Sequence, residues 1–170
     1  MRLSLREKPV LKSAVYAISC LAFLLFSYSF LPALKLFVNT TNLLVAAVSS
    51  LALFEGVRYA SFFALIFSVL ETLINGTNTL IFPLFYLVFA IVCTWLFESF
   101  FVRNYFAWVC YTLGGLFVHA CLSLFAPVAN WGIGGGAIIL ENTLPSFVLS
   151  AILSLPLYAI FKSLKRKTDK

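Results

Sequence analysis

Six apolar runs follow one another along the chain and are separated by short polar segments. Each run is close to the ~20 residues that a helix needs to cross the ~30 Å hydrocarbon core of a bilayer. The runs are continuous and do not alternate with polar residues, which favours helices over the strands of a membrane β-barrel. We therefore expect residues 1–170 to form a single polytopic membrane domain, an all-α bundle of six transmembrane helices. The predicted helices cover about 13–34, 36–54, 57–74, 77–97, 105–125 and 143–162.

The composition supports a membrane location and excludes several classes of protein. Hydrophobic residues make up 62% of the chain and charged residues 11%, whereas about a quarter of the residues of a soluble domain are charged. Little chain remains outside the apolar runs, which leaves no room for a separate catalytic or nucleotide-binding domain. The first run ends in residues 30–34, FLPAL. This ending lacks the small-x-small pattern of signal cleavage, so we expect a retained first helix.

The basic residues predict how the chain is oriented. With six spans, every Lys and Arg except Lys35 falls on the same side of the membrane. The positive-inside rule then places both termini in the cytoplasm. The net charge of +6 is explained by this topology and by contact with anionic lipid head groups, without a nucleic-acid partner. Trp95, Tyr105 and Trp108 fall near the same side and are expected to form an interfacial aromatic belt.

The third predicted helix carries a strip of small residues and one acid. Gly56, Ala60, Ala64 and Ser68 recur every four residues. At about 100° per residue, Glu71 falls in the middle of the strip that they form. Small residues allow helix backbones to approach closely in lipid. We therefore expect this strip to face neighbouring helices, with Glu71 directed into the bundle.

Two interpretations of Glu71 remain open from the sequence. The side chain is either a buried polar anchor that contacts a partner or ligand, or an interfacial acid that reaches up to the lipid head groups. Counting 1.5 Å per residue from Arg58 places Glu71 about 20 Å across the membrane. The same count from Arg103 places His119 about 24 Å across. A Glu71–His119 contact is one expectation, and ordinary hydrogen-bonded packing of His119 is the other.

Two polar segments are predicted on the outer side. Residues 39–42, NTTN, open the second helix and either cap it or contact a partner or solute through side chains such as Asn42. The longest loop is expected at 126–142, where four glycines accompany Trp131 and an apolar Ile-Ile-Leu run. This loop is either an outward contact surface or a simple connector.

No motif for catalysis is visible in the chain. The sequence lacks a Ser-His-Asp set, HExxH, a carboxylate pair, CxxC and a phosphate-binding loop. The four cysteines all lie within apolar runs, where they are expected to act as small packing residues. We therefore predict a protein that is not an enzyme, with no catalytic residues, no cofactor and no metal site.

Several features resemble the MreD family of rod-shape-determining membrane proteins. The similarity lies in the small size, the six helices with both termini inside, and the polar opening of the second helix at 40–44, TTNLL. It continues in the small-residue helix that ends in an acid, which is Glu71 here and usually Asp in the family. The final helix also runs from 155–158, LPLY, into a basic tail.

This resemblance implies a non-enzymatic scaffold of the bacterial cell-wall elongation machinery, or elongasome, in the inner (cytoplasmic) membrane. The implied partners are an MreC-like single-span protein, the peptidoglycan transglycosylase and transpeptidase, and the cytoplasmic MreB filament. Such a scaffold would support cell shape and peptidoglycan synthesis through protein–protein interaction. The residues expected to serve helix packing or partner contact are Glu71, Ser68, Ala64, Ala60, His119, Asn42 and Trp131.

A second family provides an alternative. The substrate-binding (S) subunits of energy-coupling-factor vitamin transporters are also six-helix proteins of about this size, and their fold is similar to that of the MreD family. Their first helix usually carries Ala-x-x-x-Ala, for which the nearest pattern here is Ser13-x-x-x-Ala17. A third alternative is a membrane protein that has neither role.

Overall fold

The computed structural model describes residues 9–30, 42–74, 80–99, 104–131 and 143–168. These residues are almost entirely helical and contain no strand, which confirms the all-α prediction for this part of the chain. The elements are α1 (Pro9–Leu25), its π-helical continuation η2 (Phe26–Phe30), α3 (Leu44–Glu55), α4 (Val57–Ile74), α5 (Ile81–Ser99), α6 (Tyr105–Trp131) and α8 (Leu144–Thr168).

Five of the described helices are long and apolar enough to cross a membrane, which makes this a multi-pass membrane protein. The exception is α3, whose 12 residues extend only about 18 Å. The second predicted helix began at residue 36, but residues 36–41 lie outside the described part of the chain. A sixth crossing therefore stays a prediction.

Helix α3 is the centre of the bundle. It contacts each of the other five α-helices, and every residue from Leu43 to Leu53 is buried. A helix that is apolar on all sides is stable only when other helices cover it all round. Small residues make this possible because they let neighbouring backbones approach closely. The small residues of α3 are Ala46, Ala47, Ser49, Ser50 and Ala52.

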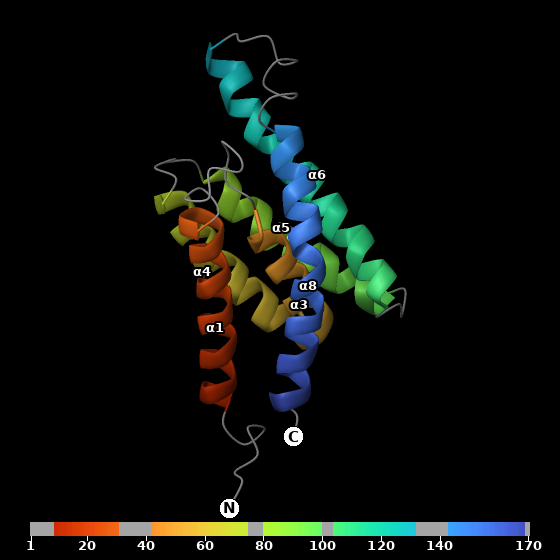
Figure 1. The fold of residues 1–170 in the computed structure, drawn as a ribbon. Coiled ribbons are helices and arrows are strands. Elements are labelled where there is room, and N and C mark those ends of the chain that lie inside the picture. The colour runs from red at the N-terminus through yellow and green to blue at the C-terminus, as the bar shows by residue number, and fades with distance from the viewer. Residues whose placement is uncertain (1–8, 31–41, 75–79, 100–103, 132–142, 169–170) are drawn as a thin grey trace, which may run out of the picture.

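The start of α1 and the end of α8 lie at the same end of the bundle (Figure 1). Polar contacts hold these segments against the end of α3. Lys12 forms an ion pair with Glu55, with 2.6 Å between Nζ and Oε2, and the Tyr16 hydroxyl donates to Glu55 Oε1 at 2.8 Å. Lys165 donates to the Phe54 carbonyl oxygen. The side of the membrane on which this end lies stays a prediction.

The predicted boundary of the fifth helix is wrong. Helix α6 continues to Trp131, so residues 126–131 are helical and do not belong to the expected loop 126–142. Ala126 and Ala129 favour a helix, although Pro127 removes one backbone donor and crowds the carbonyl four residues earlier. The remainder of that loop lies outside the described residues.

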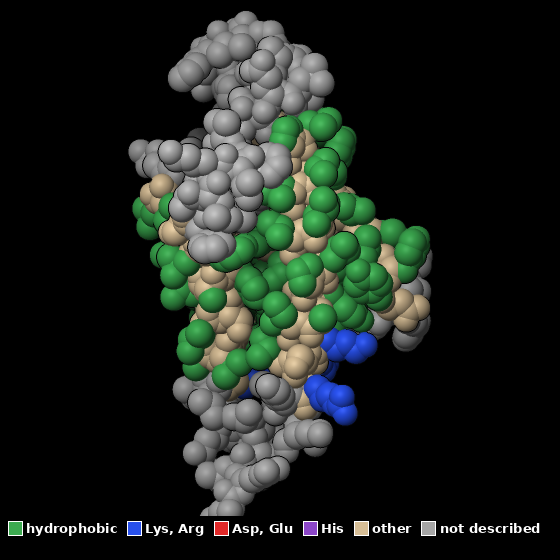
Figure 2. Space-filling view, in the orientation of Figure 1, with side chains coloured by type: hydrophobic (Ala, Val, Ile, Leu, Met, Phe, Trp, Pro, Cys, Tyr) green, Lys and Arg blue, Asp and Glu red, His purple; other side chains and the backbone are tan. Residues whose placement is uncertain are grey.

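The surface seen in Figure 2 is covered by hydrophobic side chains over most of the described part, with Lys and Arg side chains gathered where α8 ends. Large apolar side chains such as Ile18, Phe62, Leu84 and Phe117 are more than half exposed. In water this surface would be very unfavourable, whereas in a bilayer it meets acyl chains of the same polarity. The search for a functional site therefore concerns the polar side chains that lie inside the bundle.

Candidate functional site

Buried and half-buried polar side chains meet where α3 begins, and they come from five helical elements and from the residue just ahead of α3. We call this set the polar cluster. Its members are Tyr28 from η2, Asn42 just ahead of α3, Glu71 from α4, Tyr86 from α5, His119 from α6 and Ser150 from α8.

Asn42 is the centre of the polar cluster. Its Nδ2 lies 3.2 Å from Glu71 Oε1 and 2.8 Å from His119 Nε2. The Tyr86 hydroxyl donates to Asn42 Oδ1 at 2.9 Å, and the Asn42 backbone N–H donates to Ser150 Oγ at 2.8 Å. Because an amide nitrogen only donates, His119 Nε2 is an acceptor. The His119 proton then lies on Nδ1 and the imidazole is neutral.

Glu71 lies inside the bundle and is only 3% exposed. Its Oε1 accepts hydrogen bonds from the Tyr28 hydroxyl at 2.6 Å and from the Asn42 amide at 3.2 Å. Its Oε2 is buried and has no hydrogen-bond partner. This burial excludes the interpretation of Glu71 as an acid that reaches to the lipid head groups.

The small residues of the α4 strip are buried together with Glu71. Ala60, Ala64 and Ser68 are each 0% exposed, while Gly56 ends α3 with a positive φ of 83°. This conformation suits glycine, which has no Cβ to clash with the following backbone. The strip therefore serves packing within this chain, and whether a partner helix shares it stays a prediction.

Glu71 and His119 are joined indirectly. Among the described residues no hydrogen bond or ion pair connects them directly, and the Asn42 amide bridges the two side chains. The His119 ring also lies among aromatic rings, with centroid distances of 5.2 Å to Phe82 and 5.8 Å to Tyr86. The side chain is thus held by packing and by one hydrogen bond from an uncharged donor.

Two predicted contact residues have different outcomes. Asn42 does not cap α3, because Leu43 is the N-cap residue and no side chain bonds there. The capping interpretation is therefore wrong for Asn42, while residues 39–41 lie outside the described part. Trp131 is the last residue of α6, but its side chain is outside the described atoms and its contact role stays a prediction.

Sequence reasoning did not assign Tyr28, Tyr86 or Ser150 to this site. A usable signal existed for the tyrosines, since a buried hydroxyl in a membrane helix needs a hydrogen-bond partner. No comparable signal marks Ser150, because serine is common in membrane helices and bonds readily to its own backbone.

A second polar layer joins α3 to α6 nearer the other end of the bundle. Ser49 Oγ lies 2.7 Å from Thr112 Oγ1, and the Trp108 indole N–H donates to Ser50 Oγ at 3.0 Å. Trp108 is 0% exposed, so its predicted place in an interfacial aromatic belt is wrong. The indole is turned inward because Ser50 offers its N–H a buried acceptor.

The polar cluster is suited to holding helices together. Hydrogen bonds join each member to at least one other member, and Glu71 Oε2 is buried without a partner. Within the described ranges, no group of three or more His, Cys, Asp or Glu side chains is placed to hold a metal ion.

Comparison of the chain with models of known protein families, with curated proteins and with solved structures finds no significant match.

Proposed function

We propose that this protein is a non-enzymatic scaffold of the cell-wall elongation machinery in the bacterial inner membrane, and that it acts in rod-shape determination by binding an MreC-like single-span protein. The proposal combines the sequence resemblance to MreD with one structural observation. Hydrogen bonds among the members of the polar cluster link η2, α4, α5, α6 and α8 to Asn42, just ahead of α3.

The observation favours a scaffold for a physical reason. Polar side chains inside a membrane are costly and usually mark a substrate path, a proton relay or a ligand site. In the polar cluster, most donors and acceptors are used within the chain, with Glu71 Oε2 as a buried exception. Their hydrogen bonds stabilise a fixed arrangement of helices, and a fixed arrangement presents constant outer faces to partners. Glu71 then stabilises the bundle and is not itself a partner contact.

The outer faces of α4 and α5 provide apolar surface for partner helices. Phe62 and Leu73 on α4 are 58% and 69% exposed, and Leu84 and Val88 on α5 are 65% and 51% exposed. Helices associate in lipid by close packing of such surfaces. In this proposal the MreC-like protein, the transglycosylase and the transpeptidase bind through their membrane helices.

Affinity purification of the full chain co-expressed with an MreC-like protein tests the proposal. We expect the wild-type chain to recover the MreC-like protein. Glu71→Gln keeps an acceptor for Tyr28 and should retain the partner, whereas Glu71→Leu removes both hydrogen bonds of Oε1 and should lose it. Thr94→Val is the matched control, because Thr94 is buried but donates only to the Ala90 carbonyl oxygen on its own helix.

One observation favours the alternative function, that of a substrate-binding transporter subunit. Glu71 Oε2 is buried without a partner, so it offers an acceptor to a donor group on a small ligand. If the purified chain carried a vitamin and recovered an ATPase module in place of the MreC-like protein, the scaffold proposal would be wrong. Recovery of neither set of partners, with the protein intact and folded, would also contradict it.

A further inference from the structure

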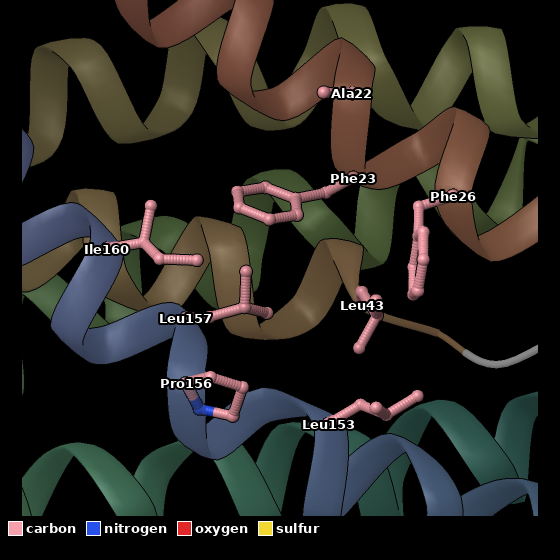
Figure 3. A pocket seen from close by; sticks show the side chains of 8 residues that line it. All are labelled: Ala22, Phe23, Phe26, Leu43, Leu153, Pro156, Leu157 and Ile160. Carbon is pink, nitrogen blue, oxygen red and sulfur yellow. The ribbon is translucent and has the colours of Figure 1, made fainter.

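An apolar pocket opens between the first and last helices of the chain (Figure 3). We call it the lateral pocket, and its volume is about 350 Å³. Its side chains come from α1, η2, α8 and the residue that precedes α3. They are Ala22, Phe23, Phe26, Leu43, Leu153, Pro156, Leu157 and Ile160.

The lateral pocket has a buried floor and an exposed rim. Leu43 and Leu157 are each 2% exposed, whereas Phe26 is 37% and Ile160 is 42% exposed. Both α1 and α8 belong to segments that are apolar enough to cross a membrane. The rim therefore faces the acyl chains of the bilayer. An apolar pocket offers water no hydrogen-bond partner, so hydrocarbon is its natural occupant.

The lateral pocket, with a volume of about 350 Å³, has room for a hydrocarbon chain. The Phe23 ring of α1 and the Phe161 ring of α8 lie 5.9 Å apart between centroids, so aromatic rings join the two helices. A flexible hydrocarbon chain follows an apolar surface of this kind, and the bilayer onto which the rim opens supplies such chains.

The charges at the ends of α1 and α8 indicate which head group accompanies the chain. Lys162 and Arg166 lie near the end of α8, where Lys165 already bonds to the Phe54 carbonyl oxygen, and Lys12 on the neighbouring start of α1 is paired with Glu55. Lys165 follows the rim residue Ile160 by five residues, or about 7.5 Å along the helix axis. Lys162 and Arg166 are exposed, and cations at a membrane surface attract anionic lipids.

We propose that the lateral pocket binds one acyl chain of an anionic phospholipid whose phosphate lies at the basic end of α8, near Lys162 and Arg166. This inference does not depend on the proposed scaffold function. Native mass spectrometry of the full chain tests it, after equilibration with equal amounts of dioleoyl phosphatidylglycerol and dioleoyl phosphatidylcholine. We expect a retained adduct of one phospholipid, with phosphatidylglycerol preferred.

Two matched variants place the lipid in the pocket. Ala22→Phe fills the pocket from α1 and should lower retention of phosphatidylglycerol about tenfold, a loss of about 1.4 kcal/mol. Ala159→Phe adds the same ring to an exposed position of α8 that does not line the pocket, and it should retain lipid as the wild type does. Replacing both Lys162 and Arg166 with alanine should reduce the preference for phosphatidylglycerol while leaving an adduct.

A second measurement covers the case in which Ala22→Phe does not fold. Phosphatidylglycerol with a photoreactive group midway along one acyl chain is added to the wild-type chain, and we expect cross-links to Phe26 and Leu153. Cross-links spread evenly over the exposed faces of α4 and α5 would overturn the proposal. So would equal lipid retention by the two phenylalanine variants, an equal preference for both head groups, or a cross-link from the pocket to a partner helix.

Discussion

Replacing Asn42 with alanine removes the centre of the polar cluster. The substitution deletes three side-chain hydrogen bonds, to Glu71, His119 and Tyr86, at 3.2, 2.8 and 2.9 Å. The backbone N–H of residue 42 and its bond to Ser150 are kept. The variant therefore isolates the side chain without breaking the chain path into α3.

The loss of stability expected for Asn42→Ala follows from the number of hydrogen bonds that are lost. Interhelical hydrogen bonds in membranes contribute about 0.6 kcal/mol each on average, so three of them amount to about 2 kcal/mol. A second estimate starts from the Tyr86 hydroxyl and the His119 ring nitrogen, which lose these partners. Each such group costs about 1–3 kcal/mol when nothing replaces the bond, or about 2–6 kcal/mol for the two. We therefore expect a loss of about 2–6 kcal/mol in the free energy of unfolding.

Thermal unfolding in a mild detergent measures this loss. For a chain of this size 1 kcal/mol corresponds to about 2–4 °C in Tm, so Asn42→Ala should lower Tm by at least about 4 °C. Thr94→Val removes a hydroxyl that is more deeply buried than Asn42 but bonds within α5, and it should change Tm by less than about 2 °C. Equal Tm values for these two variants would refute the role assigned to Asn42.

Two further predictions concern packing and the Lys/Arg-rich end of the bundle. A Cβ added at Gly115 would lie 2.5 Å from Phe89 Cε2 and 2.8 Å from a Val45 methyl, so Gly115→Ala should cost about 1–3 kcal/mol in thermal unfolding. Gly114→Ala is its control, because nothing lies within 4 Å, and it should be neutral or stabilising by up to about 1 kcal/mol. Tyr16→Phe removes the hydroxyl that donates to α3; hydrogen exchange should become faster in the first turns of α1, and unchanged exchange there would contradict the contact.

The inward face of α4 could be predicted because the signal is local. Ala60, Ala64, Ser68 and Glu71 share one side of a helix by spacing alone, and a helix in lipid turns its small and polar residues towards other helices. The same reasoning predicts a partner for Glu71 but not which one. Tyr28 lies 43 residues earlier in the chain, and nothing in local spacing encodes such a pairing.

The central position of α3 could not be predicted in the same way. Its apolar run resembles the other five runs, and hydropathy does not distinguish a helix covered by lipid from one covered by protein. The distinguishing feature is its high content of small residues, including Ala46, Ala47 and Ser50. The sequence left Asn42 open between capping and contact for a related reason, since an Asn before an apolar run usually caps a helix.

Helix ends and the orientation of aromatic rings could not be predicted from the sequence either. Prolines are common helix stops, yet α6 continues through Pro127, beyond the predicted end of the fifth helix at 125. Trp108 was placed at the interface because tryptophan is enriched there. Its actual direction is set by Ser50, a residue on another helix 58 positions earlier.

A double-mutant cycle between Tyr28 and Glu71 tests most directly the claim that the polar cluster holds the helices together. The stabilities of Tyr28→Phe, Glu71→Leu and the double variant would be measured by unfolding in the same detergent. The 2.6 Å hydrogen bond between η2 and α4 predicts a favourable coupling energy of about 0.6–1.7 kcal/mol. A coupling energy of zero would show that the two side chains stabilise the bundle independently and would contradict the account.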